Sequence, residues 1–206
     1  RMHHPVRPRL ARRGVSSVLS MMFLVIFGSL GAAMAVVAQG NLRTADSALR
    51  VSRAGSAAET GLVFASRRMQ LEAARFVVRR GVVDPVFADA LWRGTYTPAA
   101  PEDLEVLPPD GYETTSPPTG IAQAILDAHL VDEGTVSLEP GDGMLPSFDE
   151  ITGQVDARPI RLGRDENDPT FRLSYRPVPG TSRILIVSEG RDGEVRRTLQ
   201  MEFELD

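Results

Sequence analysis

The sequence predicts an α+β protein, in which a long N-terminal helix packs against a C-terminal antiparallel β-sheet. Apolar and small residues recur at intervals of three or four from residue 42 to residue 76, which is the period of one helix face. Near the C-terminus, apolar and polar residues alternate with a period of two, which is typical of a strand with one buried face. The helix stripe and the sheet face are therefore expected to bury each other.

The helix is expected to begin in a hydrophobic run, residues 15–38, which contains no charged residue. A transmembrane helix needs about 20 mostly apolar residues, so this run is long enough to cross a bilayer. No proline occurs in residues 9–84, and neither Gly55 nor Gly61 is accompanied by a turn signal. We expect one helix from about Val15 to Arg80, flexed near those two glycines.

The charge pattern predicts an orientation in the membrane. Five arginines precede the hydrophobic run, and no acidic residue occurs before Asp46. The positive-inside rule then leaves the N-terminus in the cytoplasm and exports the rest. Without residues 1–14, 18 cations face 27 acids, a formal charge of −9. This acidic balance argues against a nucleic-acid partner.

Five parts follow along the chain: a basic leader 1–14, a membrane helix 15–38, an amphipathic continuation 39–80, short helices and Pro-rich loops in 81–150, and a β-sheet region 151–206. The first part is the leader, and the second and third parts are expected to be helical. The exported remainder is long enough for one modest domain.

Short helices are expected in the middle region. Asp84 and Pro85 read as an N-cap and a first helical residue, which opens a helix that runs through about Trp92. Thr119 is expected to open another, with an apolar side made of Ile121, Ile125 and Leu126. Residues 97–120 hold six prolines and two glycines, so we expect an irregular loop there.

Strands are expected from Ile151 onward. The first contains Val155 and Ile160, the second Phe171, Leu173 and Tyr175, and the third Ile184 to Val187, with a hairpin turn at residues 190–193. In the last strand, the apolar positions Val195, Leu199, Met201, Phe203 and Leu205 are expected to form the buried face.

The N-terminal third of the chain resembles type IV pilin-like proteins. The resemblance lies in the basic leader ending at Gly14, the hydrophobic helix that follows at once, and its amphipathic continuation. It implies that a prepilin peptidase cuts after Gly14, so that Val15 becomes the first mature residue and a site of N-methylation. Residues 40–62, with Ala57, Ala58 and Glu59, resemble the segment after the anchor in PilX-like minor pilins and minor pseudopilins.

One position departs from the family pattern. Major pilins carry glutamate at the fifth mature position, whereas this chain has Leu19. Minor pseudopilins located at a fibre tip also lack that glutamate. The resemblance therefore implies a minor subunit, and favours a tip location.

The function expected from these observations is structural and not enzymatic. The chain is interpreted as a minor pilin or pseudopilin of a type IV pilus or a type II secretion fibre, anchored in the inner membrane before assembly. Its partners would be the prepilin peptidase, other pilin or pseudopilin subunits and inner-membrane lipid, with no small-molecule substrate and no cofactor. The alternatives are a single-pass envelope protein of the TadE/TadG type or one that binds a partner without a fibre, and a secreted protein cut near Gln39.

Catalytic or metal-binding residues are not expected. His129 is the only histidine of the exported part, and the chain has no cysteine, so neither a zinc site nor a nucleophile with its base can be assembled. Residues with side-chain oxygen ligands gather in two loops that remain an alternative calcium site, although solvated turns are preferred; they are the acidic residues Asp142, Asp149, Glu150, Asp165, Glu166 and Asp168, together with Asn167. Two small-residue pairs, Gly28 with Ala32 and Gly31 with Ala35, are compatible with close helix packing.

Overall fold

A computed structural model describes residues 13–78, 83–96, 104–107, 119–131, 139–140 and 145–205. The chain divides into two compact units, Arg1–Ala48 and Leu49–Asp206. The helices are α1 (Arg13–Ala73), α2 (Pro85–Arg93) and α3 (Ile121–Val131). The strands are β1 (Phe76–Val78), β2 (Leu104–Val106), β3 (Glu139–Pro140), β4 (Ser147–Asp149), β5 (Gln154–Asp156), β6 (Ile160–Arg161), β7 (Thr170–Pro177), β8 (Arg183–Asp192) and β9 (Val195–Glu204). The expected α+β class is confirmed.

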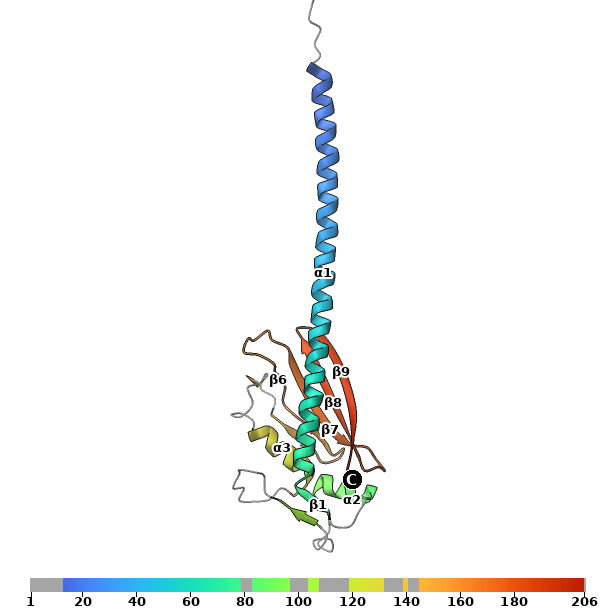
Figure 1. Ribbon diagram of the computed structural model, residues 1–206, viewed down its shortest axis with the longest axis vertical. Helices are drawn as coiled ribbons and strands as arrows, with labels where there is room; N and C mark the ends of the chain where they lie inside the picture. The colour runs from blue at the N-terminus through green and yellow to red at the C-terminus, as the bar shows by residue number, and fades with distance from the viewer. Residues whose placement is uncertain are drawn as a thin grey trace, which may run out of the picture. The chain divides into compact units, whose positions relative to one another are not determined.

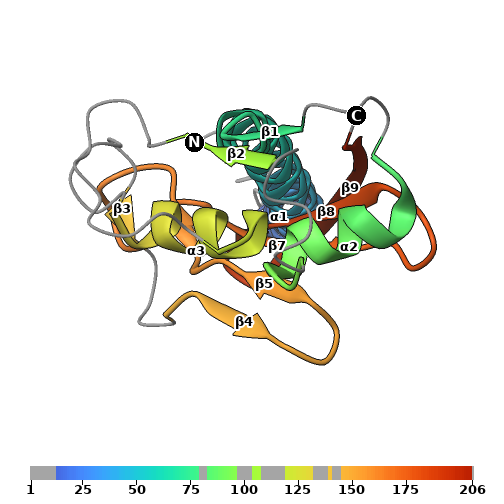
Figure 2. The same ribbon diagram turned by 90° about the horizontal axis from the view of Figure 1, so that it is seen from below.

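The second unit is built on a seven-stranded antiparallel sheet. Strand β8 lies between β7 and β9, while β7 also pairs with β5 and with β6, which follow each other along its other edge. Strands β4 and β3 extend the sheet beyond β5 and β6. Within this unit, the C-terminal part of α1 crosses one face of β7 and β8 (Figure 1). Helices α2 and α3 pack against each other, and α3 lies against β4 and β5 (Figure 2).

Helix α1 lies close to the sheet because small residues meet on both sides of the interface. Its stripe of Ala54, Ala57, Ala58 and Ala65 is completely buried. Opposite, Gly190 of β8 leaves no room for a Cβ, which would overlap the backbone of α1. The large side chains that fill the remaining space are Met69, Phe171, Leu173, Tyr175, Ile184 and Ile186. The predicted apolar stripe is thus confirmed between Ala58 and Ala73, whereas its first positions, Leu42, Ala45, Leu49 and Ser52, are exposed.

The helix expected to reach Arg80 ends earlier. Helix α1 stops at Ala73, and Phe76–Val78 forms β1, which pairs with β2 in a separate two-stranded sheet. β2 also lies inside 97–120, so the expectation of an irregular loop was wrong at Leu104–Val106. The triplet Phe76–Val78 has high β-propensity, and its backbone pairing with Leu104–Val106 outweighs the helical continuation and the flanking prolines.

Helix α2 forms as expected. The Asp84 side chain accepts hydrogen bonds from the amides of Val86 (2.9 Å) and Phe87 (3.0 Å), and Gly94 ends the helix with φ of 72°. These groups satisfy orphan backbone donors and acceptors at the two ends. Helix α3 begins at Ile121, two residues after the predicted Thr119.

The strand expectations need three corrections. Val155 and Ile160 belong to two short strands, β5 and β6, and not to one. β8 continues through Asp192, so the hairpin turn contains only Gly193 and Glu194. Gly193 has φ of 60°, which suits the first position of a two-residue hairpin turn.

The third correction concerns the last strand. Only Leu205 is buried among the five apolar residues that alternate there, while Leu199 is exposed. Among the described residues β9 pairs with β8 alone. A strand that is paired on one side has fewer neighbouring residues around its side chains than a central strand. The alternation with a period of two therefore predicts which side chains of β9 share a face, but not how deeply they are buried.

Candidate functional site

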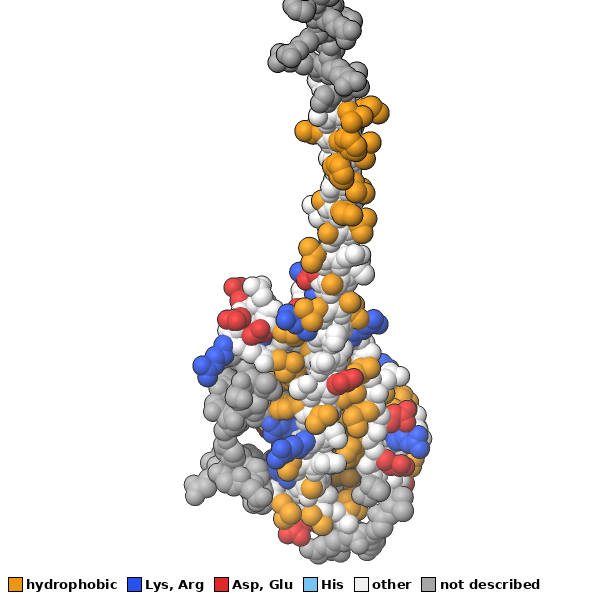
Figure 3. Space-filling view, turned by 45° about the horizontal axis from the view of Figure 1, so that its top comes forward, with side chains coloured by type: hydrophobic (Ala, Val, Ile, Leu, Met, Phe, Trp, Pro, Cys, Tyr) orange, Lys and Arg blue, Asp and Glu red, His pale blue; other side chains and the backbone are white. Residues whose placement is uncertain are grey.

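Among the described residues, the N-terminal part of α1 carries a long run of exposed apolar side chains. From Val18 to Val37 every large hydrophobic side chain is between 50% and 74% exposed. Figure 3 shows one face of this segment, on which hydrophobic side chains predominate. A helix that is apolar on all sides needs an apolar environment. By length and composition it can cross a membrane, and it is the one candidate span in the part of the chain that the structure describes.

The dimensions and polar groups of this segment fit a bilayer. Its 24 uncharged residues extend over about 36 Å as a helix, compared with about 30 Å for the hydrocarbon core. The Ser29 hydroxyl donates to the carbonyl oxygen of Ile26 at 2.8 Å, so this polar group is satisfied inside the helix. Phe23 and Phe27 stack with their ring centroids 6.2 Å apart. The first charged residue after the run is Arg43.

The expected processing junction lies at the beginning of the same helix. Gly14 and Val15 fall in the first turn of α1, with the Leu19 side chain 55% exposed one turn later. A Cβ placed on Gly28 or Gly31 would meet no atom within 4 Å. The surface around these glycines is therefore open to another helix or to lipid.

The Ala-Ala-Glu element has a structural explanation in this chain. Ala57 and Ala58 are fully buried on the sheet side of α1, whereas Glu59 is exposed. The two alanines set the close approach between α1 and β8. Glu59 contributes a solvated charge on the opposite side.

His129 is a buried residue of the fold. It is 2% exposed, its Nε2 lies 3.2 Å from the Tyr175 hydroxyl, and its ring lies against Phe64 with centroids 6.1 Å apart. The described contacts of His129 are thus those of a core residue.

The acidic loops form turns. Asp168 Oδ2 accepts a hydrogen bond from the backbone amide of Asp165 at 2.9 Å, and Asp168 N donates to the Asp165 carbonyl oxygen at 2.9 Å. Asp142 lies outside the described residues. Across the described ranges no three His, Asp or Glu side chains come together as a set of metal ligands.

Asp149 organises the turn between β4 and β5. It accepts hydrogen bonds from the Thr152 hydroxyl at 2.8 Å and from the Ile151 amide at 2.9 Å. These bonds, chiefly the one from Thr152, lower the pKa of the Asp149 carboxyl from its ordinary value of 3.8. The carboxylate is therefore ionised at neutral and mildly acidic pH.

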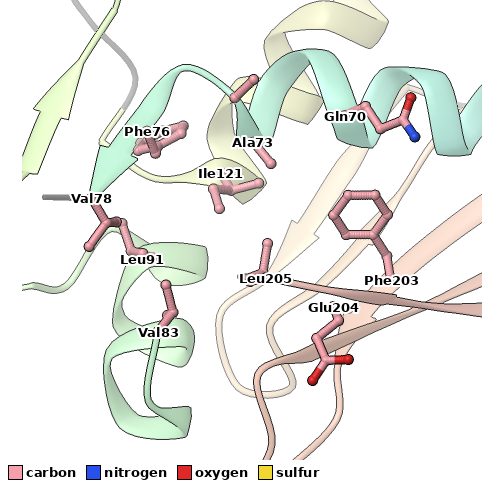
Figure 4. Close-up of a pocket in the computed structure, with 11 residues that line it drawn as sticks. Gln70, Ala73, Phe76, Val78, Val83, Leu91, Ile121, Phe203, Glu204 and Leu205 are labelled. Atoms are coloured by element: carbon pink, nitrogen blue, oxygen red, sulfur yellow. The ribbon is translucent and has the colours of Figure 1, made fainter. Parts of the chain in front are cut away.

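Among the described residues of the second unit, two hollows can be located. One of about 290 Å³ lies between the end of α1 and the end of β9, with Phe76, Leu91 and Leu205 among its lining residues (Figure 4). The other, of about 420 Å³, lies beside α2 and the β7–β8 turn. The sequence did not indicate either hollow, because each is lined by segments far apart in the chain.

Polar groups buried under α1 were also missed. Ser188 is fully buried and Asp192 is 7% exposed, and their Oγ and Oδ2 atoms have no hydrogen-bond partner among the described residues. The alternation of β8 places both on the helix-facing side, which is the one sequence signal that could have found them.

Comparisons with known proteins leave the family undefined. No family model matches the chain, and neither a curated protein nor a solved structure gives a match. The geometry of the chain itself is therefore the basis for its interpretation.

Proposed function

We propose that this chain is a non-enzymatic structural subunit of the type IV pilin-like class, a minor pilin or pseudopilin, processed after Gly14 and assembled into a pilus or a secretion fibre. The observation that carries the proposal is the continuity of α1 over 61 residues. Its first part has a surface suited to lipid or to other apolar helices, and its last part is the core helix of a sheet domain. One helix thus serves both storage in a membrane and packing in an assembly.

Assembly into a fibre would move the apolar segment of α1 from lipid to contact with neighbouring subunits. In the membrane, the side chains from Val18 to Val37 contact lipid; in a fibre, they would contact the same segments of neighbouring subunits. Both environments are apolar, so transfer between them leaves little apolar surface in water at the end of the process. The acidic second unit would remain in water throughout. The inner-membrane location and the cleavage by a prepilin peptidase enter this proposal through the resemblance to type IV pilin-like proteins.

Mass spectrometry of the protein from native membranes tests the proposal. A mature chain that begins at Val15, with a methylated amine, is the expected result. Gly14→Ala should abolish this cleavage and fibre incorporation, whereas Gly40→Ala, beyond the apolar run and at a position where a Cβ meets no atom within 4 Å, should leave both intact. Normal processing and assembly of Gly14→Ala would overturn the proposal.

A second candidate is a single-pass envelope protein, of the TadE/TadG type or a partner-binding one, that forms no fibre. Leu19 is compatible with it as well as with a minor subunit at a fibre tip, because an apolar side chain at this position cannot pair with the amine of a neighbouring subunit. This candidate requires an intact leader and permanent residence in the membrane. A first residue near Gln39 would instead identify a secreted protein.

A further inference from the structure

We draw no further inference here: the strongest candidate, the edge of the seven-stranded sheet at β9 (Val195–Glu204), which pairs with β8 alone among the described residues, carries no proposal because nothing in the structure shows what covers it.

Discussion

Gly190 of β8 lies directly beneath the carbonyl oxygen of Ala54 in α1, so close that a Cβ at position 190 would overlap that oxygen. The next turn of the helix adds a second obstacle, since the Cβ would also clash with the backbone nitrogen of Ala58. Both obstacles are backbone atoms, which cannot rotate away. The distance between helix and sheet is therefore set at this glycine.

Gly190→Ala is expected to destabilise the second unit by about 1–3 kcal/mol, because α1 must move away from β8 to admit the methyl group. Urea unfolding of the full chain, followed by the fluorescence of Trp92, measures the effect, since Trp92 is the only tryptophan and is fully buried. A variant as stable as the parent would show that the interface adapts without cost.

Gly55→Ala is the matched substitution on the helix side, and it should act in the opposite direction. A Cβ at position 55 meets no atom within 4 Å, so the change removes only the helix penalty of glycine, about 1 kcal/mol. We expect a rise in the free energy of unfolding of that size in the same urea experiment. A loss of stability would indicate that α1 bends at Gly55.

Much of the fold could be predicted from the sequence because its signals are local. The α1 stripe, the Asp84 cap and the alternation of Phe171, Leu173 and Tyr175 each depend on nearest neighbours in one element. The pairing of β1 with β2 depends instead on a contact between residues about thirty positions apart. Periodicity carries no information about such a contact, so the end of α1 was placed too late.

The candidate sites likewise fall into two groups: those that a local sequence signal reveals and those that only long-range contacts create. The apolar segment was visible because a bilayer requires a long uninterrupted run. The hollow beside α2 was not, because Val86, Thr152 and Pro179 become neighbours only when the β4–β5 turn, the β7–β8 turn and α2 meet. His129 lay within a helix that was predicted, but its burial against Tyr175 needed the sheet to be in place.

The turn at Asp149 should respond to acid. Its carboxyl has a pKa below 3.8 in the folded state, because the Thr152 hydroxyl and the Ile151 amide donate to the ionised form. A lowered folded pKa means that the contribution to stability is fully present above the unfolded pKa and is lost as the pH falls through the folded one. NMR titration of the Asp149 carboxyl should find its midpoint below 3.8. Asp149→Asn, which keeps an acceptor oxygen, should lose this part of the pH dependence, and a midpoint above 3.8 would contradict the hydrogen-bond geometry.

Two valines of α1 provide a test of membrane insertion that controls for residue type and exposure. Val25 is 60% exposed within the apolar segment, and Val63 is 73% exposed on the second unit. Val25→Arg places a charge near the middle of the expected span, which costs about 2.5–3.5 kcal/mol of insertion free energy. Val63→Arg adds the same charge to a surface that is expected to be in water, where it costs little. Fractionation of membranes after carbonate extraction should therefore show Val25→Arg depleted from the pellet and Val63→Arg retained. Equal retention of the two variants would mean that the apolar part of α1 does not reside in a bilayer.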